Sequence, residues 1–511
     1  MSFFKAKMQA AMQAVMKKAV PHFPDRMIPG GTPDPMIDRK DGRIGAAISR
    51  VDGQQKVKGE ARFASEFAPE GMVHGALAFS SIAKGRITQL DTTAAETAPG
   101  VLFVLTYRNA PRLKAIPYFL AADKSGCMDD VPVMQDEQIY WNGQPIALVI
   151  AETHEQAQHA VSLVRAEYET TDPVTSFATA RAKGTQQAVF QGEKLEHETG
   201  APEQALGAAK FSVDNTYTTP RYNHNAIEPH AVTVFWKDDA LFVHDTTQCV
   251  SHAAWSLGEI LGVGEDKVHI TSPFVGGGFG GKLVAQHHTL AAVASRSIGK
   301  PVRVALSREG VYRMIGGRTC TEQRVAIGAD ENGKFDALIH TGVVAMTAHN
   351  NVPEPFISPS QCLYAAKAMK LRVETAVVDM VANCFMRAPG ESVGSFALES
   401  AIDELADKLG IDPIELRRRN EPVKHPTDGL PHSQRDLVLA YQRGAEQFGW
   451  NQRGAPRSRR EGEWLIGMGC ATATYPYYRM PGGAAKLTLH RDGSAVVEVA
   501  GHEMGMGTAT A

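Results

Sequence analysis

One glycine-rich segment has the residue types and spacing of an anion-binding loop. Residues 276–282 read GGGFGGK, after the strand-like KVHITSPFV and before the helical HHTLAAVASRS. Successive glycines allow backbone N–H groups at a helix start to point at an anion or an oxo ligand. The pattern predicts either such a loop or a loop that needs glycine only for tight packing.

The same segment matches two nucleotide-binding patterns incompletely. It fits G-x-x-x-x-G-K, but a phosphate-binding P-loop places Ser or Thr next to hold Mg²⁺, and Leu283 stands there. Gly276, Gly278 and Gly281 fit G-x-G-x-x-G, but the following LAAVASRSIGKPVRVAL has no acidic residue for a ribose. Both nucleotide-binding interpretations are therefore disfavoured.

A third motif resembles the nucleophile elbow of serine hydrolases. Residues 390–394 read GESVG, after the strand-like VVDMVANCF and before a helix from Ser395. This G-x-S-x-G context suits an exposed nucleophile, Ser392, between Gly390 and Gly394. Later residues could complete a Ser–Asp–His order: Asp403 or Asp412, and His425 or His432. A serine hydrolase is the alternative function, although Asp403 falls inside the predicted helix and neither histidine has a clear strand–loop context.

The cysteines and the charge exclude several classes of protein. The six cysteines are isolated, at positions 127, 249, 320, 362, 384 and 470, and none forms a C-x-x-C pair. Iron–sulfur clusters and structural zinc need clustered ligands, so electrons from any redox chemistry must pass to another chain. A net charge of −3 gives no basic field for nucleic acid, and no apolar run approaches 18 residues, so we expect no membrane span.

The elements that must position these motifs suggest an α+β multidomain chain. Met8, Met12 and Met16 share a face of a predicted N-terminal helix, followed by a linker, over residues 1–38. Residues 39–171 mix strands and a helix with a self-contained core, whereas 172–210 have weak patterning and predict an irregular connector. Strands resume at 211, helices follow at 395–409 and after Asp412, and Asp492-Gly493 predicts a hairpin.

An ordered set of motifs resembles one enzyme family. RVDGQQKVKGEARF, NGQPIALVIAE, IEPHAV, TTQ, GGGFGGK, MRAPGESVGSFALESAIDELA, RRRN and GHEMGMG run in family order from about residue 44 to the end. The chain resembles the large, molybdenum-cofactor-binding subunit of the xanthine dehydrogenase/aldehyde oxidase family, most closely the bacterial three-subunit aldehyde oxidases. The resemblance implies an a/b hammerhead domain at 39–171, a first molybdopterin-binding domain at 211–425, and an incomplete second one at 426–511.

The resemblance also implies cofactors and site residues. The cofactor would be molybdenum on molybdopterin, expected as the cytosine dinucleotide, with [2Fe–2S] clusters and FAD on partner subunits. Gln248 of TTQ would donate its amide to an oxo ligand, and Arg387 would lie beside the metal. The loop would contribute Gly278, with backbone N–H groups of Phe279 and Gly280 facing the metal. Four residues would wrap the pterin, namely Met504, Gly505, Met506 and Gly507, although many relatives have Gln where this chain has Met506.

Departures from the family pattern predict the substrate. Purine-hydroxylating members have Glu where this chain has Leu283, and Arg at the position that falls on Pro355 when counted back from Arg387 without gaps. The loss of both polar anchors favours aldehydes over purines as substrates. The aromatic stretch YPYY, which begins at Tyr475, is expected to face the substrate, so aromatic aldehydes are included. Glu228 of EPHA is expected to be a structural acid.

The resemblance places the catalytic base outside this sequence. Family members use a Glu near the end of the full-length subunit as general base, in a G-x-G-E-type segment that would lie beyond residue 511. We therefore expect residues 1–511 alone to be inactive. The expected location is cytoplasmic, or periplasmic if the subunit is exported with a partner's signal.

Overall fold

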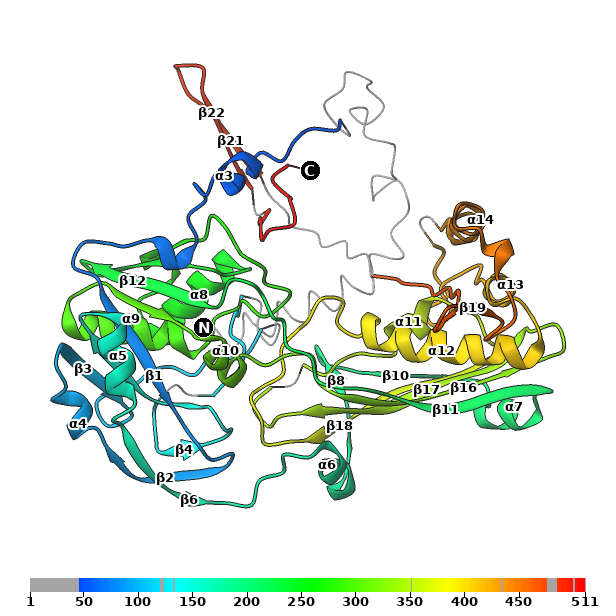
Figure 1. Ribbon diagram of the computed structural model, residues 1–511, viewed down its shortest axis with the longest axis horizontal. Helices are drawn as coiled ribbons and strands as arrows, with labels where there is room; N and C mark the ends of the chain where they lie inside the picture. The colour runs from blue at the N-terminus through cyan, green and yellow to red at the C-terminus, as the bar shows by residue number, and fades with distance from the viewer. Residues whose placement is uncertain are drawn as a thin grey trace.

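The computed structural model describes residues 46–119, 124–131, 134–350, 352–432, 435–475, 485–499 and 501–510. The predicted N-terminal helix and linker at 1–38 lie outside the described residues. The described chain forms two lobes, each built on a large sheet with helices packed against it (Figure 1).

The first lobe is built on a seven-stranded mixed sheet in the order β14-β13-β12-β15-β1-β5-β3. Its strands are β1 (Val73–Phe79), β3 (Val101–Thr106), β5 (Pro145–Ala151), β12 (Ala231–Lys237), β13 (Ala240–Asp245), β14 (Val268–Thr271) and β15 (Val302–Ala305). Every residue of β5 is buried, as its continuous apolar run PIALVIA predicts for a central strand. The helices of this lobe are α5 (His154–Val161), α8 (Val250–Leu261), α9 (Gln286–Ile298) and α10 (Arg308–Met314).

The expectation that residues 39–171 have a self-contained core is only partly met. Strand β1 pairs in parallel with β15, with Val73 opposite Val302. One apolar core therefore mixes Leu148 of β5 with Val232 of β12 and Leu290 of α9. Two smaller cores are drawn from this region alone. One lies between the sheet β4-β2-β6 (Gln138–Ile139, Gly85–Asp91 and Arg165–Thr170) and residues of β1, β3 and β5, and the other joins Ala76, Ala151 and Ala157.

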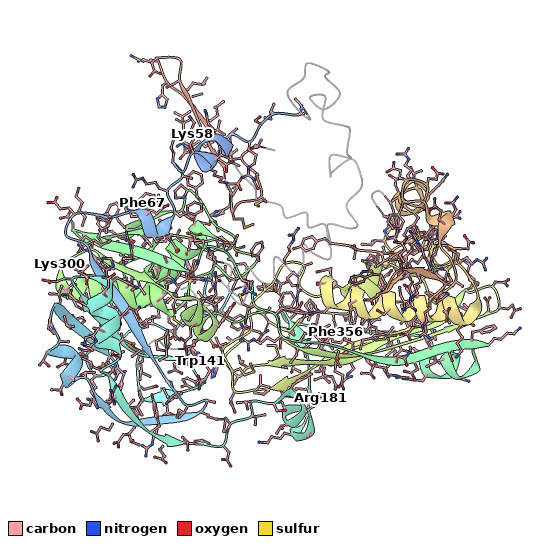
Figure 2. All side chains as sticks on the ribbon, viewed as in Figure 1. Lys58, Phe67, Trp141, Arg181, Lys300 and Phe356 are labelled. Carbon is pink, nitrogen blue, oxygen red and sulfur yellow. The ribbon has the colours of Figure 1, made fainter. Side chains whose placement is uncertain are left out.

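The second lobe is a sheet in the order β10-β18-β17-β16-β11, with β7 also paired to β18. The long strands are β11 (Phe211–Thr219), β16 (Thr321–Ala329), β17 (Phe335–Met346) and β18 (Ala368–Val377). Helix α12 (Glu391–Leu409) lies along one face of this sheet (Figure 1). It begins four residues before the predicted start at Ser395. Figure 2 shows the fully buried Phe356 near the start of α12.

The stretch 172–210 is not irregular, so that prediction is corrected. It contains α6 (Phe177–Lys183), β7 (Gln186–Gln187), β8 (Val189–Phe190), β9 (Glu193–Lys194), β10 (Glu196–Thr199) and α7 (Pro202–Ala208). Strands β7 and β10 extend the second sheet by pairing with β18. The sequence pattern is weak because these strands are two to four residues long and mostly exposed.

The C-terminal elements match several expectations. Helix α13 (Pro413–Arg419) begins after Asp412, whose carboxylate accepts the backbone N–H of Ile414 and Glu415, as the capping pattern predicts. The hairpin of β21 (Ala485–Leu489) and β22 (Ala495–Val499) turns at Gly493, which has a φ of +87°. Helix α14 (Leu437–Phe448) and the pair β19 (Arg459–Glu461) and β20 (Trp464–Ile466) lie between them in sequence.

The remaining short helices are α3 (Gly53–Val57), α4 (Thr93–Glu96) and α11 (Ser358–Cys362), with 3₁₀ turns η2 (Ala64–Glu66), η3 (Glu265–Lys267) and η4 (Trp450–Gln452). Within the described ranges, every helix is too short or too polar to traverse a lipid bilayer.

A buried histidine in the second lobe makes stability depend on pH. His340 is fully buried, with Nδ1 2.7 Å from Ser360 Oγ and Nε2 3.0 Å from Gln323 Oε1. Burial lowers its pKa to about 3. Because the unfolded chain takes up a proton near pH 6.5 and the folded chain does not, the free energy of unfolding should fall as the pH drops from 6.5 towards 3.

The His340→Leu variant isolates this contribution. It should be less stable than the wild type at pH 8, and the difference in free energy of unfolding should shrink by pH 4. Denaturant titrations at both pH values measure it. A difference that stays constant with pH would contradict the interpretation.

Candidate cofactor site

The glycine loop 276–282 lies between β14 and α9 and is held at both ends by the EPHA segment. Glu228 Oε2 accepts the N–H of Gly276 at 2.6 Å, and the His230 ring Nε2 lies 2.7 Å from the carbonyl of Gly281. Burial lowers the pKa of His230 to about 3, so the ring is neutral and Nε2–H donates to this carbonyl. The loop is therefore fixed before any ligand binds, and Glu228 has the structural role expected of it.

The Lys of this loop is not available to a phosphate. Lys282 is fully buried, and its Nζ donates to Glu228 Oε2 at 2.6 Å and to Thr246 Oγ1 at 2.8 Å. Burial lowers the pKa of Lys282, and the Glu228 carboxylate opposes that shift. A P-loop lysine must reach out to phosphate oxygens, so this geometry removes the P-loop interpretation.

Gln248 is oriented by the loop. Its Oε1 accepts the N–H of Gly280 at 2.9 Å and that of Lys282 at 3.2 Å, while its Nε2 lies 3.3 Å from Met504 Sδ. A Cβ added to Gly278 would lie 2.4 Å from the Gln248 side chain, which explains why glycine stands there. The amide oxygen is committed to the loop, and the amide donor faces the segment around Met504.

The backbone of the loop differs in one respect from the expected arrangement. The N–H of Gly280 is used by Gln248, so it does not point freely at a metal as expected. The N–H of Phe279 has no acceptor among the residues that the structure describes. Phe279 has a φ of +54°, which is unfavourable for a side chain of its size and marks a loop held in a particular shape.

The segment 501–510 lies against Gln248 from a distant part of the chain. The Glu503 carboxylate accepts the N–H groups of Gly505, Gly507 and Ala509 at 2.7, 2.9 and 3.0 Å, and these bonds lower its pKa. This acceptor organises the turn that presents Met504. Gly505 and Gly507 have φ values above +100°, and Met506 is more than half exposed.

The Arg387 loop meets the glycine loop directly. The Arg387 N–H donates to the carbonyl of Phe279 at 2.9 Å, and Cys384 Sγ donates to that of Gly280 at 3.0 Å. A Cβ on Gly280, at φ +102°, would lie 2.1 Å from the carbonyl oxygen of Phe385. The Arg387 side chain is exposed, and among the described residues its guanidinium has no hydrogen bond or ion pair.

Leu283 lies in a small cavity that adjoins both loops. It is 5% exposed and helps to line a narrow crevice, partly open to solvent, with room for no more than about one water molecule. Phe119 and Phe385 also line this space, and their rings pack edge to face with centroids 5.7 Å apart. Phe119 was not found from the sequence because it lies in a stretch without a motif.

The other two positions discussed for the substrate are not in this cavity. Tyr475 is 66% exposed and does not line it. Residues 476–478 of the aromatic stretch lie outside the described residues. Pro355 packs under the Arg387 loop, with its carbonyl 2.4 Å from where a Cβ on Gly390 would be.

The serine hydrolase constellation is not assembled in the described part of the chain. Ser392 is exposed in the first turn of α12, and no described histidine hydrogen-bonds to it. Asp403 pairs with Arg417 at 2.8 Å, Asp412 caps α13, and His425 lies 3.1 Å from Asp428. The G-x-S-x-G match instead reflects the close approach of Gly394 to the Phe356 carbonyl, 1.9 Å from a built Cβ.

Comparison with protein families identifies the class of this arrangement. Residues 182–421 match a molybdopterin cofactor-binding domain, and residues 443–511 match a second model of that description. Residues 58–172 match the a/b hammerhead domain of aldehyde oxidase and xanthine dehydrogenase. The two loops thus lie in a molybdopterin-binding domain. The chain belongs to the aldehyde oxidase and xanthine dehydrogenase family, among its molybdenum-binding subunits.

Individual relatives agree with this placement. The chain is 37% identical over 474 residues to the aldehyde oxidoreductase molybdenum-binding subunit PaoC of Escherichia coli K12, covering 91% of this chain and 62% of the relative. It is 27% identical to the putative xanthine dehydrogenase molybdenum-binding subunit XdhA of the same organism, covering 90% and 64%. The chain therefore spans less than two thirds of these relatives.

Solved structures show the same fold. The aldehyde oxidoreductase from Desulfovibrio desulfuricans has a TM-score of 0.74 at 23% identity, covering 90% of this chain and 53% of that one. The reconstituted CO dehydrogenase from Oligotropha carboxidovorans has a TM-score of 0.74 at 19% identity, covering 91% and 63%. At these identities the likeness concerns the fold alone.

Proposed function

We propose that this chain is the molybdenum-binding part of an enzyme that oxidises aldehydes, including aromatic ones, to carboxylic acids with water as the oxygen source. The observation that carries the proposal is the convergence of four distant segments on one site. Gln248, the Phe279–Gly280 turn, Arg387 and Met504 are joined by contacts of 2.9 to 3.3 Å between Gln248 and Gly280, Arg387 and Phe279, and Gln248 and Met504.

The residues present fit an oxo-bearing, anionic cofactor. Among the residues that the structure describes, the Gln248 amide donor has only the thioether sulfur of Met504 as partner, and a thioether is a weak acceptor. The Phe279 N–H and the Arg387 guanidinium have no partner among the described residues, and both belong to the joined loops. These groups would hold molybdopterin, proposed as the cytosine dinucleotide, with Met504 to Gly507 along the pterin. When bound, the molybdenum supplies oxygen transfer and takes up the electron pair.

The chain itself would position the cofactor and the substrate. Gln248 and the Phe279 N–H would donate to the oxo ligands, a fixed arrangement that needs no reorganisation during the reaction. Arg387 would add positive charge where negative charge develops. The apolar side chains of Leu283, Phe119 and Phe385 lie beside the two loops and would form part of the surface against which the apolar part of an aldehyde packs.

Electrons would leave to partner subunits that carry [2Fe–2S] clusters and FAD. The support is that relatives such as PaoC are described as subunits and that the described cysteines are isolated thiols, with no cluster of metal-ligating side chains among the described residues. The assembly is proposed to work in the cytoplasm, or in the periplasm if exported with a partner.

Metal analysis of the purified complex tests the proposal. We expect molybdenum with about four iron atoms per molybdenum, the content of two [2Fe–2S] clusters. Residues 1–511 and the full-length subunit should be purified side by side with the partners. We propose that the shorter chain has no aldehyde oxidation, because the resemblance places the general base beyond residue 511. A metal-free protein labelled at Ser392 by a fluorophosphonate would instead establish the hydrolase.

A further inference from the structure

A buried ion pair lies directly behind the loop that carries Arg387. Arg318 precedes β16, and Glu354 lies between β17 and α11; each side chain is 5% exposed. Arg318 Nε and Glu354 Oε1 are 2.9 Å apart. Neither residue was identified from the sequence, because Arg318 and Glu354 are separated by 36 positions and no motif links them.

This pair contacts nearly the whole backbone of residues 386–390. Arg318 Nη2 donates to the carbonyls of Met386 at 2.7 Å and Ala388 at 3.0 Å, and to that of Arg387 between them. Glu354 Oε1 accepts the N–H of Gly390 at 2.7 Å. One charged pair therefore bonds three successive carbonyls of this loop, through Arg318, and the N–H at the end of the loop, through Glu354.

The loop needs such support because its backbone is strained. Ala388 has a φ of +59°, an unfavourable conformation for a residue with a side chain, which persists only where surrounding contacts enforce it. Three carbonyls that converge on one guanidinium are such contacts. With them in place, the Arg387 N–H meets the Phe279 carbonyl and the Arg387 side chain stays exposed beside the glycine loop.

Stability alone does not account for this pair. Removing two charges from water costs free energy that their mutual attraction often fails to recover, so buried ion pairs are weak evidence of net stabilisation. Burial accordingly raises the pKa of Glu354, although Arg318 opposes that shift. The pair is placed where it determines the shape of one loop.

We propose that Arg318 and Glu354 are positioning residues that fix the 386–390 backbone and thereby present Arg387 to the cofactor. The inference rests on the proposed function for the role of Arg387, but its structural part concerns the loop alone. Arg318→Lys keeps the charge and removes the planar group whose Nε bonds Glu354 while its Nη2 reaches three carbonyls.

A matched control is available in the same lobe. Arg417 is also fully buried, pairs with Glu399 at 2.8 Å and with Asp403 at 2.8 Å, and does not contact the loop. Arg417→Lys therefore makes the same chemical change in an equally buried ion pair. Both variants should be made in the complete holoenzyme, with turnover expressed per bound molybdenum and with hydrogen exchange measured on peptides covering 386–390.

We expect Arg318→Lys to lower turnover per molybdenum by about 10- to 100-fold, the scale for residues that orient a metal site through another group. It should also raise hydrogen exchange at 386–390 by about tenfold or more, because the lost hydrogen bonds to a charged group favour local opening by about that factor. Arg417→Lys should leave both quantities near the wild-type values. Equal losses in both variants, or unchanged exchange and turnover in Arg318→Lys, would overturn the proposal.

A second variant covers the case in which Arg318→Lys does not fold. Glu354→Gln keeps the size of the side chain and an acceptor for the Gly390 N–H. The loop should therefore keep its conformation, while the ion pair with Arg318 is replaced by a weaker hydrogen bond. Glu354→Gln should lower turnover per molybdenum and raise hydrogen exchange at 386–390, both by smaller factors than Arg318→Lys. Hydrogen exchange at the wild-type rate in this variant would overturn the proposal. If the wild type proves to lack molybdenum, the proposed function fails while the exchange measurement still decides the structural claim.

Discussion

Gln248→Ala should lower turnover of the cofactor-loaded enzyme by about 10²-fold or more, the scale for the loss of one donor fixed against developing charge. The wild-type amide is held with its oxygen on the N–H groups of Gly280 and Lys282 and its donor facing Met504. Alanine removes the donor, while Glu228 and His230 still hold the two ends of the loop. Turnover per molybdenum, with metal content and circular dichroism measured in parallel, tests the prediction.

Two further variants separate the donor from the acceptor and from general packing. Gln248→Glu keeps an oxygen for both loop N–H groups and replaces the donor, so it should lose as much turnover as the alanine variant. Gln323 is a buried amide in the second lobe that bonds Thr321 and Val393, and Gln323→Ala should affect stability without a comparable loss of turnover per molybdenum. Wild-type turnover in Gln248→Ala would remove Gln248 from the site.

The sequence predicted the local chemistry of the loops because each depends on neighbouring residues. Glycines at 276–282, the cap at Asp412 and the hairpin at Asp492-Gly493 impose their backbone shapes over a few positions, and the structure has them. The motif order then predicted the family, which the comparisons confirm. The three motifs that mimic nucleotide-binding proteins and hydrolases are explained by tight packing. A Cβ at Gly276, Gly278 or Gly281 would collide with a neighbouring side chain, and a Cβ at Gly394 would collide with the Phe356 carbonyl.

What the sequence could not supply was pairing between distant segments. Nothing local to Val73 shows that β1 pairs with β15, so the core of 39–171 looked self-contained. The strands in 172–210 are too short for a periodic signal. Gln248 accepts the N–H of Gly280, and Arg318 donates to the backbone of the loop that carries Arg387. These contacts join side chains to distant segments that meet only after folding.

The apolar residues beside the proposed site predict discrimination against purines. A purine carries several donors and acceptors, and leaving them unpaired in a buried site costs free energy for each group. Where relatives that hydroxylate purines place Glu, this chain has the buried Leu283, and the other cavity residues include Phe119 and Phe385. The amide Nδ2 of Asn350, which also lines the cavity, is committed to the carbonyls of Met128 and Asn383. Among the described residues that line this space, Asn383 Oδ1 is a buried acceptor without a hydrogen-bond partner, so the surface is mainly apolar but retains one free polar atom.

The complete enzyme should therefore oxidise benzaldehyde and similar apolar aldehydes with kcat/KM about 10²-fold or more above that for hypoxanthine or xanthine, because an apolar pocket rejects an added polar group by about that factor. Parallel assays under identical electron-acceptor conditions measure the ratio directly. Leu283→Glu should lower kcat/KM for benzaldehyde because it places a carboxyl group in the apolar wall, and Leu283→Met, which keeps the volume and polarity, should change it little. Efficient formation of uric acid by the wild type would show that other residues replace the missing anchors, and the assignment of an aldehyde substrate from Leu283 would then be wrong.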